Sequence, residues 1–213
     1  MADNNNNNNK SWRTEGNRIE ADDWLGTRND RPLRIRTNNQ ERMSITLEGN
    51  VGIGTTNPTA KLAVNGDVEV TGDIRLLGAD CAEDFDVSEA EAAEPGTVMV
   101  IDQEGTLKPS KQPYDKRVAG VVSGTGSLKP GIILDKQESN GGRLPVALIG
   151  KVACKADAQY SPIQVGDLLT TSPTPGHAMK ATDSPKAFGA VLGKALKALD
   201  EGTDTIPVMV ALQ

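Results

Sequence analysis

The chain has 213 residues, a net charge of −6 and a 37% share of hydrophobic residues, with only two Phe, two Tyr and two Trp. Since bulky rings usually anchor a globular core, this composition predicts thin cores built from Val, Ile, Leu and Ala. The acidic balance without a strong basic block argues against nucleic-acid binding, and no stretch approaches the roughly 20 apolar residues that cross a bilayer.

Residues 1–18 are predicted to form a flexible, Asn-rich arm. They include an uninterrupted Asn tract from Asn4 to Asn9 and almost nothing apolar, so burial cannot offset the entropy cost of ordering them. Docking to a larger assembly is an alternative that would order the arm. The segment also lacks the charged and apolar regions of a signal peptide. We therefore expect synthesis in the cytoplasm, and action outside the cell would require release by lysis or as part of a larger particle.

Residues 19–79 show short alternating apolar runs, such as Leu33–Arg36, separated by turns rich in Gly and Asn. A small repeat is present, because Gly66-Asp67-Val68 recurs as Gly72-Asp73-Ile74. Between Ile45 and Leu77, about ten apolar side chains are too few to offset the entropy cost of fixing the backbone. We therefore predict an intertwined β stalk of three identical chains, which also covers exposed strand edges.

An acidic connector, residues 80–94, is predicted to lead into a compact β domain, residues 95–213. The connector holds the densest acidic cluster, from Asp80 to Asp86. In the domain, residues 95–124 and residues 165–193, about seventy positions apart, share one pattern. Each has a Gly, an apolar strand, a turn and a second apolar strand that contains Gly. The fold class is therefore mainly β, with an internally duplicated barrel-like or sandwich-like domain. Gly120 and Gly189 are expected where backbones approach closely or a strand bends.

Few residues point to catalysis. His177, the single histidine, is interpreted as a turn residue, because no Cys or Asp stands at zinc-ligand spacing and no Gly-x-Ser-x-Gly elbow is present. Cys81 and Cys154 are too far apart for a CxxC site and are interpreted as free thiols, with a disulfide as the alternative. We predict no enzymatic activity, no catalytic residue and no cofactor. A hydrolytic or self-processing C-terminal domain, using a Ser–Lys pair, is the alternative.

Two residue pairs are candidates for binding. Asp67 and Asp73 occupy equivalent places in the short repeat, and threefold symmetry would gather either carboxylate into a ring that could hold a metal ion. Solvent-facing turn carboxylates without metal are the default interpretation. Tyr114 and Tyr160 are the aromatic side chains available to stack on a receptor sugar. For both tyrosines a structural role is the alternative.

The run from Asn50 to Asp67, NVGIGTTNPTAKLAVNGD, resembles a motif that recurs in phage tail fibres and related bacterial surface fibres. Trp24–Thr27 and Pro32–Met43 resemble the strands that usually accompany it. The resemblance implies a trimer of intertwined β-strands that acts as a stalk or connector in a phage tail or contractile injection particle. Lys116–Gly124 and Val165–Thr182 are similar to a β-rich domain that follows such stalks in uncharacterised bacterial proteins. That domain implies no particular activity.

Together these features predict a homotrimeric structural or attachment component, similar to a tail fibre. The arm would dock to tail or baseplate proteins, and the stalk would fix the trimer. The C-terminal domain would then be displayed for multivalent binding to cell-surface glycan or protein. A structural cap or plug of an injection particle, without receptor binding, is the alternative. We expect no nucleic-acid partner and no membrane insertion.

Overall fold

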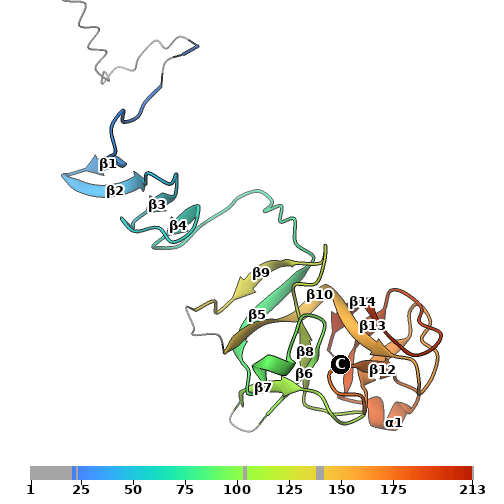
Figure 1. Cartoon of the computed structure of the whole chain (residues 1–213). Coiled ribbons are helices and arrows are strands. Elements are labelled where there is room, and N and C mark those ends of the chain that lie inside the picture. Colours follow the sequence, from blue (N-terminus) through green and yellow to red (C-terminus); the bar gives the residue numbers. More distant parts are fainter. Residues whose placement is uncertain (1–20, 23, 103–104, 138–141, 213) are drawn as a thin grey trace, which may run out of the picture. The chain divides into compact units, whose positions relative to one another are not determined.

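The computed structural model describes residues 21–22, 24–102, 105–137 and 142–212 (Figure 1). The predicted arm, residues 1–18, lies outside this range. The chain divides into an N-terminal unit, which ends at Asp73, and a C-terminal unit, which begins at Ile74. Strands make up 44% of the structure and helices 4%, which confirms the mainly β class.

The N-terminal unit is a four-stranded sheet in the order β1-β2-β3-β4. Its strands are β1 Leu33–Thr37, β2 Gln40–Ile45, β3 Val51–Ile53 and β4 Leu62–Val64. β1 and β2 form a hairpin through Asn38 and Asn39, which both have positive φ angles (48° and 57°). Asn tolerates this conformation better than most residues, and two such residues give the turn whose twist suits a hairpin. β3 runs antiparallel to β2, and β4 runs parallel to β3.

The C-terminal unit holds the remaining strands and two short helical turns. Its strands are β5 Asp80–Asp86, β6 Val98–Ile101, β7 Leu107–Pro109, β8 Val118–Val122, β9 Pro130–Leu134, β10 Arg143–Asp157, β11 Leu168–Thr171, β12 Ala178–Lys180, β13 Val191–Ala195 and β14 Thr203–Ala211. The helical turns are η1 Ala90–Ala92 and α1 Ser184–Ala187.

Five strands of this unit close into a barrel. The order β12-β11-β13-β14-β10 returns on itself, because Ala178 of β12 also pairs with Ala156 of β10. The first half of the long strand β10 leaves the barrel and pairs with β5 and β8. The barrel interior is filled by fully buried aliphatic side chains, including Val152, Leu169, Leu192, Ile206 and Val208. A second apolar cluster, around Met99, Leu107, Val122 and Val146, packs beside it. The predicted barrel-like domain is therefore confirmed.

The internal duplication is also confirmed, by strand pairing. In the first copy β6 pairs with β7 on one side and with β8 on the other. In the second copy β11 pairs in the same way with β12 and β13. Each central strand has an irregularity at the same place, directly after Met99 in β6 and after Leu169 in β11. Met99 pairs with Gly120, and Leu169 pairs with Gly193.

The glycine that corresponds to Gly120 is thus Gly193, and the expectation for Gly189 was wrong. A Cβ atom at Gly120 would lie 2.3 Å from the carbonyl oxygen of Ala147, and one at Gly193 would lie 2.1 Å from that of Met209. Only a residue without a side chain allows neighbouring strands to approach this closely. Gly189 instead lies in the turn before β13, and a Cβ atom there would meet nothing within 4 Å.

The segment 80–94 does not form the predicted acidic connector. Its first half is strand β5, which pairs with β10 on one side and with β9 on the other. Asp80, Ala82 and Asp84 are buried on alternate positions of this strand. Asp80 accepts a hydrogen bond of 2.7 Å from the Ser123 hydroxyl, and burial raises the pKa of its carboxyl group. The segment is therefore an integral part of the C-terminal unit, which begins before the predicted boundary at residue 95.

Candidate functional site

The most distinctive surface of the described chain is one face of the N-terminal sheet. The strand registers place two rows of apolar side chains on this face, each crossing all four strands. We call them together the apolar face. Its residues are Leu33, Ile45, Val51 and Leu62 in one row, and Ile35, Met43, Ile53 and Val64 in the other. Side chains two residues apart on a strand share a face, so the eight form one surface.

None of the eight side chains of the apolar face is buried in the single chain. Ile53 is 43% exposed and Leu62 61%. Among residues 21–22 and 24–73, the buried ones are Ser44, Gly52 and Pro58. This unit therefore has no buried aliphatic core of its own, in contrast to the C-terminal unit.

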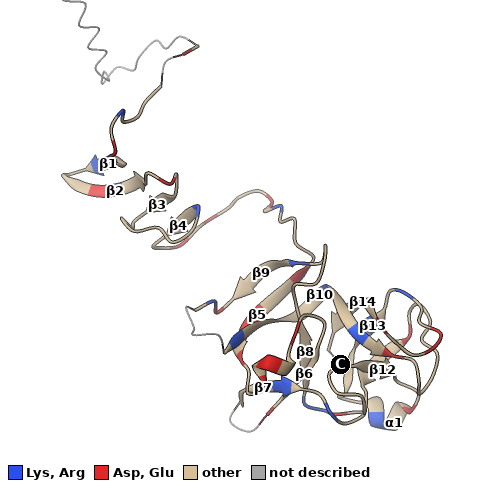
Figure 2. Ribbon diagram, in the orientation of Figure 1, with Lys and Arg blue, Asp and Glu red and all other residues tan. Residues whose placement is uncertain are grey.

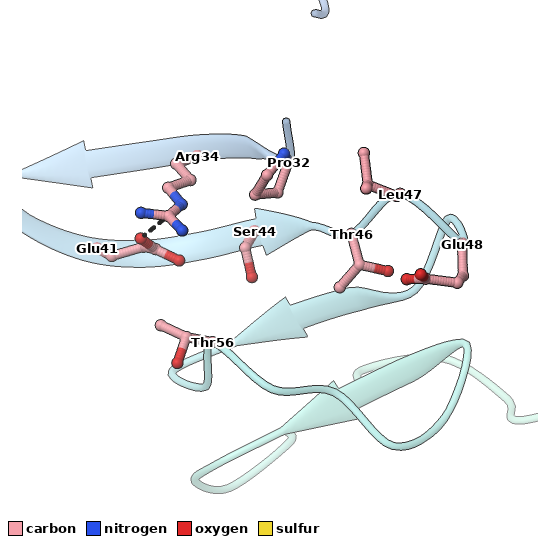
Figure 3. Close-up of a pocket in the computed structure, with 8 residues that line it drawn as sticks. All are labelled: Pro32, Arg34, Glu41, Ser44, Thr46, Leu47, Glu48 and Thr56. Carbon is pink, nitrogen blue, oxygen red and sulfur yellow. Dashed lines mark ion pairs between the residues drawn. The ribbon is translucent and has the colours of Figure 1, made fainter. Parts of the chain in front are cut away.

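The opposite face of the sheet is polar, and the loop at Thr55 covers it at Ser44 and Gly52. The Ser44 hydroxyl lies 3.4 Å from the carbonyl oxygen of Thr55, and a Cβ atom at Gly52 would lie 2.3 Å from that same oxygen. Beside this loop lies a groove that contains the Arg34–Glu41 ion pair (3.4 Å) and Ser44 (Figure 3). Polar side chains can stay in contact with water, so the apolar face is the surface that needs a partner.

A second exposed apolar feature follows β4 along the chain. Each copy of the short repeat has apolar side chains two positions apart, Val68 and Val70 in the first copy and Ile74 and Leu76 in the second. All four side chains are exposed. No residue from Gly66 to Leu77 belongs to a strand in the single chain. Alternating apolar residues are typical of a strand that covers one face, so this segment has the pattern of a strand without its neighbours.

The candidate metal residues Asp67 and Asp73 lie in this segment, and both are exposed. Within one chain, the described residues include no group of three or more His, Cys, Asp or Glu side chains that could hold a metal ion. A carboxylate ring built from three chains stays a prediction.

Tyr114 has structural contacts. Its hydroxyl oxygen accepts hydrogen bonds of 3.0 Å from the backbone N–H groups of Thr182 and Asp183. The Lys186 ammonium lies 5.9 Å from the centre of its ring. Tyr114 thereby connects the segment before β8 to the loop between β12 and α1. Such use of the hydroxyl favours the structural alternative for this residue.

The remaining candidates are dispersed over the C-terminal unit. Tyr160 is 55% exposed, and its receptor role stays a prediction. His177 lies in a turn, and its Nδ1 atom is 2.8 Å from the Pro175 carbonyl oxygen. Cys81 and Cys154 are free thiols, as predicted. Cys154 is buried in the barrel, where desolvation raises its pKa to about 12.

Acidic and basic residues both occur in each of the two units (Figure 2). Within the described ranges, no helix has the length and apolar character that crossing a membrane requires. Sequence reasoning found most of the runs that form the apolar face. It did not find that they share a single face, because this depends on the pairing registers of β1 to β4.

No model of a protein family matches the sequence. A comparison with curated proteins finds no match either. Three solved structures from bacteriophage phi29 are similar to parts of the chain. The C-terminal fragment of gene product 12 has 14% identity and a TM-score of 0.45, over 62% of this chain and 100% of that fragment. The pre-mature gene product 12 has 11% identity and a TM-score of 0.48, over 81% of this chain.

This chain covers 24% of the length of the pre-mature gene product 12. The third structure, the head fiber gp8.5 N base, has 13% identity and a TM-score of 0.33, over 62% of this chain and 90% of that one.

Proposed function

We propose that the chain is a homotrimeric structural component, similar to a fibre, in which the N-terminal units of three copies cover one another's apolar faces. The observation that carries the proposal is the apolar face itself: eight aligned aliphatic side chains, none of them buried in the single chain. An exposed apolar surface of this kind marks an interaction site in a soluble protein. Identical chains are the simplest partner, because each presents the same surface.

Burial energetics support this assignment. A fully buried aliphatic side chain contributes roughly 1.5 to 3 kcal/mol, and the apolar face together with the residues after β4 supplies several such side chains per copy. The backbone of the segment from Gly66 to Leu77 also lacks strand partners, and parallel copies would provide them. The number of copies, three, follows the resemblance of the run from Asn50 to Asp67 to trimeric fibre motifs.

The two units then have separate tasks. The N-terminal unit and the following segment hold the trimer together, and the C-terminal unit, with its own buried core, is displayed. Three copies of a weak binding site on one particle raise avidity by orders of magnitude, which suits attachment to a cell surface. We place this assembly in a phage tail or contractile injection particle, with tail or baseplate proteins as partners of the N-terminal end.

Substitution within the apolar face tests the proposal. Ile53→Asp places a charge at the centre of the surface that the three copies bury, so the variant should be a single chain where the wild type is three chains. Light scattering after gel filtration measures both masses. Ile101→Asp, at a 45% exposed position on β6 of the other unit, is the matched control and should stay trimeric. A trimeric Ile53→Asp variant would show that the apolar face is not the contact.

A further inference from the structure

The outer surface of the C-terminal unit carries an apolar patch where strands β9, β5, β10 and β14 are neighbours (Figure 1). The registers align Ile132, Cys81, Ile149 and Ala211 in one row across these strands. Ile149 is 60% exposed, and Leu76 lines the same hollow as Ile132, Cys81 and Ile149. We call Leu76, Cys81, Ile132, Ile149 and Ala211 the entry patch, because the chain enters the C-terminal unit beside it.

Glycines hold the incoming chain tightly against this patch. A Cβ atom at Gly78 would lie 2.2 Å from the backbone nitrogen of Gly131 in β9, and one at Gly150 in β10 would lie 2.7 Å from the carbonyl oxygen of Ala79. Side chains at these positions would push the incoming backbone away from both strands. The patch and the first residues of the unit are therefore fixed relative to each other.

We propose that the entry patch is a second contact surface between copies, at which the C-terminal units of the trimer touch one another. This inference rests on the trimer proposed above. Cys81 follows Ile74, the first residue of the unit, by seven positions, and an extended chain spans at most about 3.5 Å per residue. Three chains joined up to Asp73 therefore bring their entry patches within about 25 Å of their shared point of exit.

Tethering makes a weak contact sufficient. Modules joined by short connections reach effective concentrations of about a millimolar, so the patches associate even if the dissociation constant between separate domains is as weak as about a millimolar. The residues of the entry patch are aliphatic apart from a thiol. A sugar site would need an aromatic ring for stacking and several directed polar groups. A second copy of the same apolar surface suits this composition better.

Charges at the two ends of the patch favour a ring of copies. Glu83 lies two residues after Cys81 on β5, and Lys151 lies two residues after Ile149 on β10. Because β5 and β10 are antiparallel, the two charges flank the row on opposite sides. Neither Glu83 nor Lys151 forms an ion pair with a described residue of its own chain. In a threefold ring each copy meets its neighbour head to tail, so Glu83 of one copy can face Lys151 of the next.

The thiol of Cys81 reports on this contact in the full chain. In the wild-type trimer we expect Cys81 to react with an uncharged disulfide reagent such as 4,4′-dithiodipyridine at least tenfold more slowly than in the Ile149→Asp variant. The variant should keep the mass of three chains, because the apolar face still holds it together. Cys154 should not react with the reagent in either protein, since it is fully buried and its pKa is raised to about 12.

Charge reversal separates a broken contact from a damaged fold. Glu83→Lys should accelerate the reaction of Cys81, and the double variant Glu83→Lys with Lys151→Glu should restore the slow rate, which a misfolded unit would not do. A wild-type trimer whose Cys81 reacts as fast as in Ile149→Asp would overturn the inference and leave the trimer intact. A mass of one chain for the wild type would overturn the proposed function and this contact with it.

Discussion

The close approach of backbones at Gly120 and Gly193 makes the stability of the C-terminal unit depend on single residues. Sequence reasoning identified Gly120 from its place in an apolar run, but it aligned the second copy on Gly189. The error has a physical cause. Both segments contain Gly within apolar residues, and only the register of β13 with β11 and β14 decides which Gly lacks space for a side chain.

Alanine substitution at these glycines should have unequal effects. Gly193→Ala forces a Cβ atom to within 2.1 Å of the Met209 carbonyl oxygen, so we expect a loss of more than about 2 kcal/mol. Gly189→Ala meets no atom within 4 Å and bears only the strain of its φ of +77°, about 1 kcal/mol. Denaturant unfolding followed by circular dichroism measures both. Equal losses would contradict the assignment of Gly193 as the counterpart of Gly120.

Asp115 gives a residue-scale prediction of pH dependence. Its carboxylate accepts hydrogen bonds from Arg117 Nε (2.9 Å) and Nη2 (2.6 Å), and these lower the pKa of Asp115. A carboxyl group whose pKa is lower in the folded state contributes stability above its unfolded-state pKa of about 4. The contribution is lost as pH falls through the lowered folded-state value.

Asp115→Asn should therefore reduce the free energy of unfolding by about 1 kcal/mol at pH 7. The difference from wild type should shrink toward pH 3, where the wild-type carboxyl group begins to take up a proton. Urea unfolding of both proteins at the two pH values is the measurement. An unchanged difference at pH 3 would mean that the charge of Asp115 does not carry the effect.

At the scale of elements, the predictable strands were those with a run of Val, Ile or Leu, such as β8 and β14. β5 was missed because its buried positions are Asp80, Ala82 and Asp84, which do not form an apolar pattern. It becomes a strand because β9 and β10 pair with it on both sides, a long-range effect that local sequence does not encode. β13 begins only at Val191, because α1 and the turn that follows it occupy the preceding residues.

Tyr114 connects the segment before β8 to the loop between β12 and α1. Removing its hydroxyl group tests how much this connection stabilises the C-terminal unit. Tyr114→Phe keeps the ring but deprives the N–H groups of Thr182 and Asp183 of their acceptor. We expect a loss of about 1 to 2 kcal/mol, which lowers the midpoint of thermal unfolding by several degrees. A variant as stable as the wild type would show that these hydrogen bonds matter little, and would reopen a surface role for the tyrosine.

At the scale of the whole molecule, the sequence predicted two regions of different character, and the structure gives the physical distinction between them. The C-terminal unit buries its own apolar clusters. The N-terminal unit aligns eight aliphatic side chains on one face and buries none of them. The shortage of apolar residues was visible in the sequence. Their gathering on a single face was not, because it depends on the registers of β1 to β4.

The mass of the intact wild-type chain at equilibrium tests the central claim most directly. Sedimentation equilibrium over a dilution series from tens of micromolar to below one micromolar should give three chain masses, because the apolar face is stable only when covered. A single chain mass throughout, with the N-terminal sheet still folded by circular dichroism or hydrogen exchange, would contradict the account.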